Sequence, residues 1–450
     1  MFYEAETGDL NLIAVGDTIL VRPVSMFREK NFLALVELIR SADVAFSNPE
    51  MLFHNYEMPA AAMPNVAYVV AHPRLIEEFK WLGFDLLCDA HSHSWDYGDE
   101  GLLTTLRHLD EAGLTHAGAG HNLAESRAPA YLETPKGRVA LLSCVSSFPD
   151  GARAGDQRPD HVGRPGVSFL RHKKIYTVDR TSLDSISLMD GKLGQEEEKQ
   201  HWRHMGQFMS TPPVPDDTDA EFHFLGHHFR LGEDFSVTSV PNEEDLNDIL
   251  RWVREARRQA DWVLMSIHSH EYANGEPGKG IEDPPSFLEA FARRCIDEGV
   301  DIFLGHGPHF IRGMEIYKGK PIFYGLGNVA FQNEVYPKLP ADSYSRFGLG
   351  HHHTPADLYD TKTQVDDPNS KVESIYWEGL VAQPIFKGWN LDEVRLYIAD
   401  QGQDQPRSRH GRPVLAEKDV ATRALERMAS LSARYGSEIR IRDGVGYVRP

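Results

Sequence analysis

The sequence predicts an α/β fold in which parallel strands alternate with helices. Short apolar runs typical of buried strands recur along the chain, for example at residues 10–15 and 262–267. Segments with helical spacing of apolar residues separate them, such as residues 100–109 with four leucines on one face. Five of the apolar runs lead into a carboxylate or a histidine. That placement is expected at the edge of a parallel sheet where ligands bind.

The first third of the chain contains five predicted strands with helices between them. The strands are predicted at residues 10–15, 43–47, 84–88, 114–120 and 139–145. An amphipathic helix at residues 31–40 follows the first strand, and Gly83 ends a second helix just before the third strand.

Regular structure is predicted again from residue 242, where an acidic first turn favours a helix N-terminus. Strands are then predicted at residues 262–267, 300–304, 314–317, 322–326, 380–385 and 393–398. The third and fourth of these form a predicted hairpin. A terminal helix is predicted at residues 416–435.

Two loop-rich stretches interrupt this pattern. Residues 148–241 are rich in Arg, His, Asp and Pro, and we interpret them as an insertion or lid. Residues 333–373 are a second loop insertion, whose histidine run we interpret as surface. Residues 1–147 and 242–332 would form the two halves of one domain, and residues 374–450 would complete it with strands and a helix.

Composition excludes several classes of protein. The chain has 450 residues and a formal net charge of −20, which disfavours nucleic acid and anionic membranes as partners. Three cysteines in apolar stretches indicate buried reduced thiols. The sequence contains neither a signal peptide nor an apolar run of ~18 residues that could anchor it in a membrane. We therefore predict a cytoplasmic protein, and homo-oligomerisation stays open.

Carboxylates and histidines at the strand ends are the candidate metal ligands. They are Asp17, Glu50, His91, His268, His270, His306 and His309. Oxygen and imidazole ligands without thiolate suit Mn, Fe or Zn better than Ca. The set is large enough for two ions ~3.5–4 Å apart with a bridging water, an arrangement that suits hydrolysis.

His93 and Asp96 form a candidate acid pair on the turn before the helix at 100–109. Because they are three residues apart, Asp96 can orient the imidazole and raise its basicity, as in a general acid that protonates a leaving group. Direct metal ligation and a structural role for His93 are the alternatives.

The first insertion carries a basic cluster in an otherwise acidic protein: Arg153, Arg158, Arg164, Arg171, Lys173 and Lys174. It is either a solvated surface or an anion-binding wall for the substrate.

Taken together, the motifs resemble the CapA-like family of poly-gamma-glutamate capsule synthesis proteins, within the calcineurin-like metallophosphatase superfamily. The matching segments occur in the family's order, at residues 14–17, 48–50, 82–85, 90–98, 113–120, 266–268, 305–309 and 321–328. The resemblance implies a four-layer αββα metallophosphatase-like sandwich. It also implies roles for the following residues: Asp17, bridging Glu50, His268 and His309 as ligands, and His93 as the histidine of the family's Asn-His pair.

Two positions depart from the family pattern. His91 and Ser92 stand where the family usually has two asparagines, and Gly307 stands where it commonly has a histidine. His270 and His306, together with His91, either rebuild the site with more imidazole or mark a site with one tight metal.

We therefore predict a metal-dependent hydrolase that uses one or two divalent ions (Mn, Fe or Zn). Its substrate would be an anionic small molecule or polymer with an amide, ester, lactone or phosphoester bond. The alternative is a non-catalytic binding or assembly protein in the synthesis of capsule (poly-gamma-glutamate) polymer. A third interpretation, in which the histidines only form hydrogen bonds in the core, explains their positions at strand ends less well.

Overall fold

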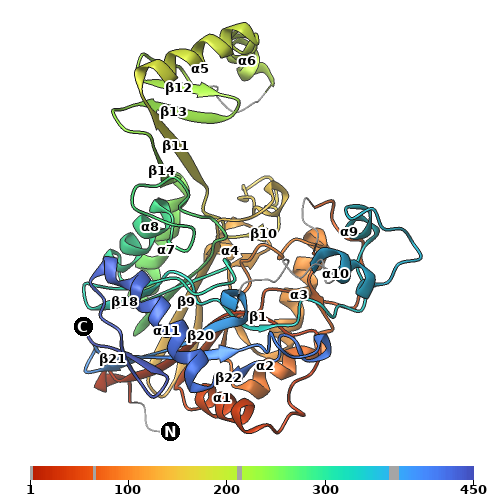
Figure 1. Ribbon diagram of the computed structural model, residues 1–450, viewed down its shortest axis with the longest axis vertical. Coiled ribbons are helices and arrows are strands. Elements are labelled where there is room, and N and C mark those ends of the chain that lie inside the picture. The colour runs from red at the N-terminus through yellow and green to blue at the C-terminus, as the bar shows by residue number, and fades with distance from the viewer. Residues whose placement is uncertain (1–3, 64–66, 210–214, 364–373) are drawn as a thin grey trace. The chain divides into compact units, whose positions relative to one another are not determined.

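Two β-sheets packed face to face form the centre of the computed structural model (Figure 1). The structure describes residues 4–63, 67–209, 215–363 and 374–450. Residues 210–214 and 364–373, which belong to the two predicted insertions, lie outside the described residues.

The larger sheet has ten strands. In spatial order its main path is β23 (Arg440–Arg442), β24 (Val445–Val448), β21 (Asn390–Asp400), β20 (Glu378–Lys387), β1 (Leu10–Ile19), β2 (Val44–Asn48), β5 (Leu86–Cys88) and β6 (Thr115–Ala117). Two further strands, β19 (Asn328–Phe331) and β22 (Val414–Leu415), pair with β1 and β21. Strands β1, β2, β5 and β6 are parallel, so their carboxyl ends meet at one edge.

The smaller sheet has six strands. Their order is β17 (Met314–Tyr317), β18 (Lys320–Phe323), β16 (Ile302–His306), β15 (Trp262–His268), β9 (Gly137–Val145) and β8 (Ala130–Thr134). Strands β9, β15, β16 and β18 are parallel. Strands β17 and β18 form the predicted hairpin, which is confirmed.

Alternating side chains of the strands create the layers. In β1, Leu12 and Ala14 enter the core between the two sheets, together with Leu264 of β15. Ile13 and Val15 point to the opposite face, where they join a second buried cluster. That cluster includes the apolar faces of two helices, α1 (Lys30–Arg40) and α2 (Ile76–Leu82).

Helix α7 (Glu243–Gln259) covers the outer face of the smaller sheet. Its apolar side is buried, and Arg257 bonds Asp301 just before β16 at 2.8 Å. The predicted four-layer αββα sandwich is therefore confirmed. At its end, α11 (Lys418–Ser432) adds buried side chains to the core between the sheets, and the Ser432 hydroxyl accepts a hydrogen bond from the Met314 amide of β17.

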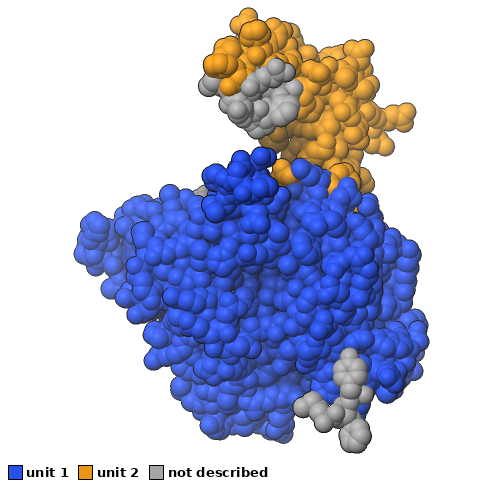
Figure 2. Space-filling model, turned by 180° about the vertical axis from the view of Figure 1, so that it is seen from behind, with its two compact units in different colours: residues 1–170, 244–271, 292–450 blue, residues 171–243, 272–291 orange. Residues whose placement is uncertain are grey.

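The chain divides into two compact units, coloured separately in Figure 2. Unit 1 comprises residues 1–170, 244–271 and 292–450, and it contains the sandwich. Unit 2 comprises residues 171–243 and 272–291, so it overlaps the predicted insertion but also includes a segment after β15.

Unit 2 contains more regular structure than the sequence pattern predicted. Its four-stranded sheet has the order β12 (Glu221–Phe224), β13 (His227–Leu231), β11 (His172–Val178) and β14 (Ser236–Pro241), and its helices are α5 (Arg180–Lys192) and α6 (Gln195–Met209). Most of its strand residues are only partly buried, as in β11. A small sheet with so little core lacks the continuous apolar runs from which strands were predicted.

The remaining helices and short strands connect these layers. They are β3 (Leu52–Phe53), β4 (Val70–Ala71), α3 (Gly98–Ala112), β7 (Ala119–Gly120), α4 (Leu123–Arg127), β10 (Gly166–Val167), α8 (Ser286–Asp297), α9 (Ala341–Ser345) and α10 (Pro355–Thr363). In the part of the chain that the structure describes, no helix combines the length and apolar character needed to cross a membrane. All three cysteines are buried and free, as predicted, whereas the cytoplasmic location stays a prediction.

Candidate metal centre

Asp17 lies within β1 rather than beyond its end, where the sequence placed it. The pairing register of β1 shifts next to Asp17, opposite both β2 and β19. Gly16 makes this possible, because a Cβ atom there would lie 2.0 Å from the carbonyl oxygen of Gly327. The irregular strand turns the buried Asp17 carboxylate toward the smaller sheet.

Glu50 follows the end of β2, two residues after Asn48. The Asn48 amide donates to Asp17 Oδ1 at 2.8 Å, and both carboxylates are fully buried. Oε1 of Glu50 accepts a hydrogen bond from Ser92 at 3.1 Å. Oε2 has no hydrogen-bond partner among the described residues.

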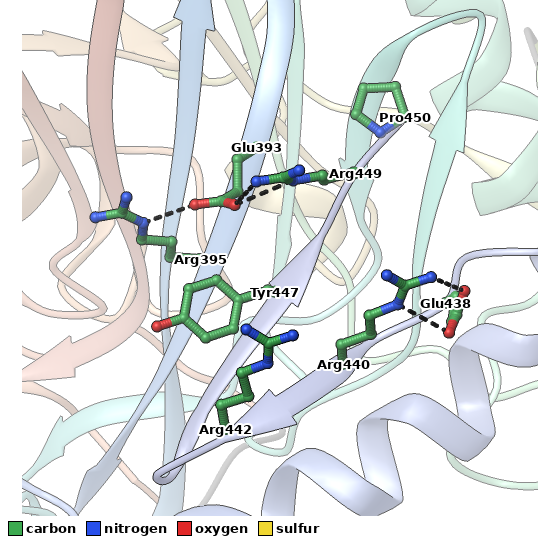
Figure 3. A pocket seen from close by; sticks show the side chains of 8 residues that line it. All are labelled: Glu393, Arg395, Glu438, Arg440, Arg442, Tyr447, Arg449 and Pro450. Carbon is green, nitrogen blue, oxygen red and sulfur yellow. Dashed lines mark hydrogen bonds and ion pairs between the residues drawn. The ribbon is translucent and has the colours of Figure 1, made fainter.

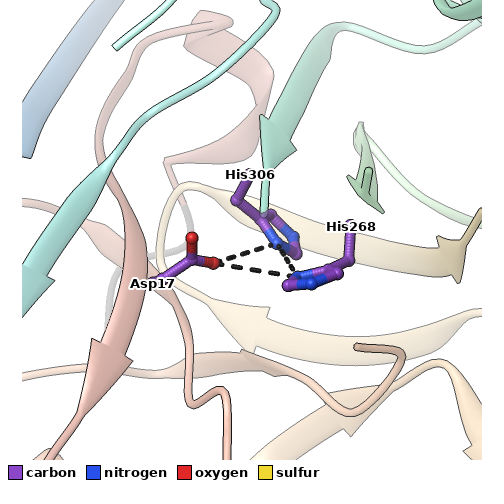
Figure 4. Close-up of side chains that lie close together, drawn as sticks. All are labelled: Asp17, His268 and His306. Carbon is purple, nitrogen blue, oxygen red and sulfur yellow. Dashed lines mark hydrogen bonds and ion pairs between the residues drawn. The ribbon is translucent and has the colours of Figure 1, made fainter. Parts of the chain in front are cut away.

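Three histidines come from the carboxyl ends of β15 and β16, which are neighbouring parallel strands. His268 and His306 are opposite each other in the register, and their Nδ1 atoms are 3.2 Å apart. Nε2 of His268 is 2.8 Å from Nε2 of His270. The other nitrogen of His306 contacts the Ser266 hydroxyl at 2.7 Å, which directs Nδ1 toward Asp17 (Figure 4).

His309 occupies a left-handed backbone conformation, with φ of 65°. Such conformations are uncommon for residues other than glycine and cluster at functional sites. Nδ1 of His309 lies 3.4 Å from Asp17 Oδ2 and 3.7 Å from Glu50 Oε2, and it also contacts Asn328 Oδ1 at 2.9 Å.

These side chains form three overlapping groups, and the members of each group present their ligand atoms within 4.8 Å of one another. The groups are Asp17, His268 and His306; Glu50, His268 and His270; and Asp17, Glu50 and His309. A neutral imidazole has one unprotonated nitrogen, so His268 can serve only one of the first two groups at a time. The groups therefore offer at most two ion positions that share carboxylates.

The electrostatics of the carboxylates fit a cation. Burial raises the pKa of Glu50 to about 7, although His309 opposes this shift. Burial also raises the pKa of Asp17, but hydrogen bonds from His306 and His309 outweigh it and hold the pKa well below the usual value. Burial lowers the pKa of His268 well below its ordinary value, which keeps the imidazole neutral and able to act as a ligand.

His93 and Asp96 form the expected pair. Nδ1 of His93 is 2.8 Å from Asp96 Oδ2, and Nε2 is 3.9 Å from Glu50 Oε1. Burial lowers the pKa of His93, but Asp96 and Glu50 raise it, and the net shift is upward.

His91 is buried beside His268, with ring centroids 6.3 Å apart, but it belongs to none of the three groups. Its Nδ1 has no hydrogen-bond partner among the described residues. Six of the seven expected ligands thus converge in the groups, and ligation by His91 stays a prediction.

Comparison with known proteins identifies the family. The family model described as bacterial capsule synthesis protein PGA_cap matches residues 11–333. The chain belongs to the PGA_cap family. This confirms the resemblance to CapA-like proteins.

Relatives match most of the chain. Protein y4sH of Sinorhizobium fredii is 35% identical, over 97% of this chain and 92% of the relative. Capsule biosynthesis protein CapA of Bacillus anthracis is 23% identical, over 72% of this chain and 61% of the relative. A solved structure from Staphylococcus aureus, provisionally named a 5'-nucleotidase and in complex with alpha-ketoglutarate, is 13% identical over 70% of this chain and 48% of that chain. The TM-score of this match is 0.33.

Three polar residues of the centre had no role in the sequence prediction. Asn48 binds Asp17, Asn328 binds His309, and Ser266 binds His306. The two asparagines lie at the end of β2 and the start of β19. Their position at the sheet edge was the sequence signal that could have indicated a role in the centre. Each orients a candidate ligand, a role typical of residues around metal sites.

The basic cluster of this PGA_cap protein is divided between the two units. Arg153 and Arg158 pair with acidic neighbours, at 3.3 and 3.0 Å, and lie in unit 1. Arg171 and Lys173 line a cavity of about 660 Å³ within unit 2, together with Arg230. Whether any of these residues binds substrate stays a prediction.

A cavity of about 750 Å³ lies on strands β21, β23 and β24 (Figure 3). Two of its arginines, Arg395 and Arg449, pair with Glu393, and Arg440 pairs with Glu438. None of the candidate ligands lines it.

Proposed function

We propose that this PGA_cap protein is a metal-dependent hydrolase. The observation that carries the proposal is the position of Glu50, whose two oxygens face different histidines. Oε1 lies 3.4 Å from His268 Nε2, and Oε2 lies 3.7 Å from His309 Nδ1. A buried carboxylate placed in this way would hold divalent cations together with these histidines.

The donor set favours Mn, Fe or Zn, because it combines carboxylates with imidazoles. Asp17, Glu50 and His309 would hold one ion, and His268, with His270 or His306, would complete the sites. When bound, such ions lower the pKa of water and stabilise the charge that develops on oxygen atoms during hydrolysis. The Oε2 atom of Glu50 supports this assignment: it has no hydrogen-bond partner in the described part of the chain, and a buried acceptor without a partner is costly.

His93 would supply the proton for the leaving group. Asp96 fixes the orientation of the ring through Nδ1, so Nε2 points toward Glu50 and carries the transferable proton of the imidazolium. The upward shift of the His93 pKa favours this protonated form.

The candidate cation site and the relatives support a substrate class. We propose an anionic small molecule or polymer with an amide, ester, lactone or phosphoester bond. The relatives named for capsule biosynthesis support a polymer-related substrate. Their names favour equally the second candidate, a non-catalytic assembly role in polymer synthesis.

Elemental analysis by ICP-MS of untagged protein tests the proposal. We expect one or two equivalents of Mn, Fe or Zn in the wild type and a loss of metal in the Asp17→Ala and His268→Ala variants. His352→Ala is the matched control, because it removes an exposed imidazole from a loop. The metal-loaded protein is then assayed with bis(p-nitrophenyl) phosphate, p-nitrophenyl acetate and γ-glutamyl-p-nitroanilide. Wild-type protein that takes up no added metal contradicts the hydrolase, whereas metal without turnover of any substrate favours the assembly role.

A further inference from the structure

The carboxylate of Glu271, the residue after the candidate ligand His270, accepts hydrogen bonds from three serine hydroxyls. Ser147 donates to Oε1 at 2.8 Å. Ser146 and Ser269 donate to Oε2, at 2.7 and 2.8 Å. Hydrogen bonds to an ionised acceptor are stronger than those between neutral groups, so this carboxylate fixes three serine side chains at once.

These hydrogen bonds connect the ends of two neighbouring strands. Ser146 and Ser147 follow β9, and Ser269 follows β15, which is parallel to β9. The Ser146 amide also donates to the carbonyl oxygen of His268, at 2.9 Å. Glu271 therefore ties the segment after β15 to the segment after β9.

Ser147 extends this network to the backbone of His270. Its hydroxyl oxygen accepts a hydrogen bond from the His270 amide at 2.7 Å and donates its proton to Glu271 Oε1. A hydroxyl has one proton and two lone pairs, so it can make both bonds at the same time. The charge of Glu271 polarises the hydroxyl and strengthens the bond to the His270 amide.

The backbone of Glu271 is held from a different direction. Arg312 is fully buried, and its Nη2 donates to the Glu271 carbonyl oxygen at 2.6 Å. The Arg312 amide donates in turn to the carbonyl oxygen of Gly325 at 3.0 Å. The chain directly after His270 is thus fixed through both the side chain and the carbonyl of Glu271.

The position of the His270 ring depends on this support. Its side chain is 31% exposed, whereas the Glu50 side chain is fully buried. The ring makes its polar contacts through Nε2, which lies 2.8 Å from His268 Nε2, 3.2 Å from the Ser92 hydroxyl and 3.8 Å from Glu50 Oε1. A metal-binding histidine usually has its second nitrogen fixed by a hydrogen bond, but Nδ1 of His270 has no such partner among the described residues. The backbone therefore carries more of the task of aiming the ring.

We propose that Glu271 is a positioning residue, which holds His270 beside His268 and Glu50 by way of Ser147. This inference rests on the metal centre of the proposed function and assigns a role to a residue outside its three ligand groups. Glu271 would not bind the ion itself, because the serine hydroxyls occupy both of its oxygens. It acts on the metal only through the imidazole that precedes it.

A double-mutant cycle on metal affinity tests this role. Mn²⁺, and Zn²⁺ in a parallel series, are titrated calorimetrically into metal-free wild type, Glu271→Ala, His270→Ala and the double variant. We expect Glu271→Ala to weaken binding about 10- to 100-fold, as is typical for residues that support a metal ligand. In the His270→Ala background the same substitution should change the affinity less than 2-fold, because the ring that it positions is gone.

Glu78→Ala is the matched control. Glu78 is also a partly buried carboxylate that accepts a serine hydroxyl, from Ser25 at 2.9 Å, and two backbone amides. It belongs to none of the ligand groups, so its loss should leave metal affinity unchanged. Glu271→Gln keeps the shape of the side chain and one carbonyl acceptor. It should retain more affinity than Glu271→Ala, and it replaces that variant in the cycle if the alanine protein does not fold.

The outcomes separate this proposal from the metal centre itself. Equal metal affinity in the wild type and both Glu271 variants overturns the positioning role. The same fold loss from Glu271→Ala with and without His270 also overturns it, because Glu271 would then act through the fold as a whole. A similar loss in Glu78→Ala leads to the same conclusion. Wild-type protein that binds neither Mn²⁺ nor Zn²⁺ contradicts the hydrolase function.

Discussion

Asp96 holds His93 in one orientation. Oδ2 of Asp96 lies 2.8 Å from Nδ1 of His93 and accepts a second hydrogen bond, from the Val69 amide, at 2.8 Å. The second bond fixes the carboxylate, and the carboxylate fixes the ring. Nε2 of His93 is thereby left facing Glu50, 3.9 Å away.

Replacing His93 should therefore impair turnover without removing metal. We expect His93→Ala to lower kcat about 10²- to 10⁴-fold, the usual contribution of a general acid, and Asp96→Asn to have a smaller effect. ICP-MS on the same samples should find the wild-type metal content. His108→Ala is the control, because His108 pairs with Glu111 on α3 and is not one of the candidate ligands. Loss of metal from His93→Ala would reassign this residue as a ligand.

The sequence pattern predicts the layers and most of the candidate metal ligands, because buried strands are visible as apolar runs and the ligands lie where these runs end. Buried strands such as β15 and β16 are continuous apolar runs, and His268 and His306 directly end them. Parallel strands then bring these histidines to one edge of the sheet. The pattern predicts Asp17 beyond its strand, because the register shift in β1 has no local signal apart from Gly16.

The sequence pattern does not predict contacts between residues that are far apart in the chain. The hydrogen bond between Asn48 and Asp17, for example, joins two different strands. The pattern does not predict the strands of unit 2, because they bury few side chains completely.

Glu50→Gln should have opposite effects on metal binding and on the stability of the metal-free protein. The substitution removes a ligand oxygen charge, so metal content should fall. It also removes a fully buried charge without changing the side-chain shape, and in the absence of metal that charge is costly. We expect the metal-free variant to be more stable than the metal-free wild type, with a free energy of unfolding that is about 1–3 kcal/mol higher.

Urea unfolding in the presence of a chelator measures the difference. Glu77→Gln, whose side chain is 66% exposed, serves as the control and should leave both quantities unchanged. A less stable metal-free Glu50→Gln protein would show that the carboxylate supports the fold rather than a cation.

Gly307 should not tolerate a side chain. Its φ is 108°, and a Cβ atom would lie 2.8 Å from the Ser269 nitrogen and 3.2 Å from His268 Nε2. Gly307→Ala should therefore displace His268 and reduce metal content, and it should destabilise the protein by more than the roughly 1 kcal/mol expected from φ alone.

Gly319→Ala isolates the effect of the backbone conformation. Gly319 has a φ of 77° in the β17–β18 hairpin, but an added Cβ atom there would meet nothing within 4 Å. Equal losses of thermal stability and unchanged metal content in the two variants would contradict the steric argument at Gly307.

His116 should make the stability of the protein depend on pH. Its Nδ1 lies 2.5 Å from Asp89 and its Nε2 3.1 Å from Asp110. Burial lowers the pKa of His116, but the two carboxylates outweigh it and raise the pKa to about 9. Because the folded pKa exceeds the unfolded value of about 6.5, the stabilisation is complete below pH 6.5 and is lost as the pH rises through 9. Urea unfolding of chelated wild type and His116→Gln at pH 6, 7.5 and 9.5 should show a stability difference of roughly 1–3 kcal/mol that shrinks with increasing pH. A difference that stays constant from pH 6 to 9.5 would mean that the His116 imidazole contributes through packing, not through its charge.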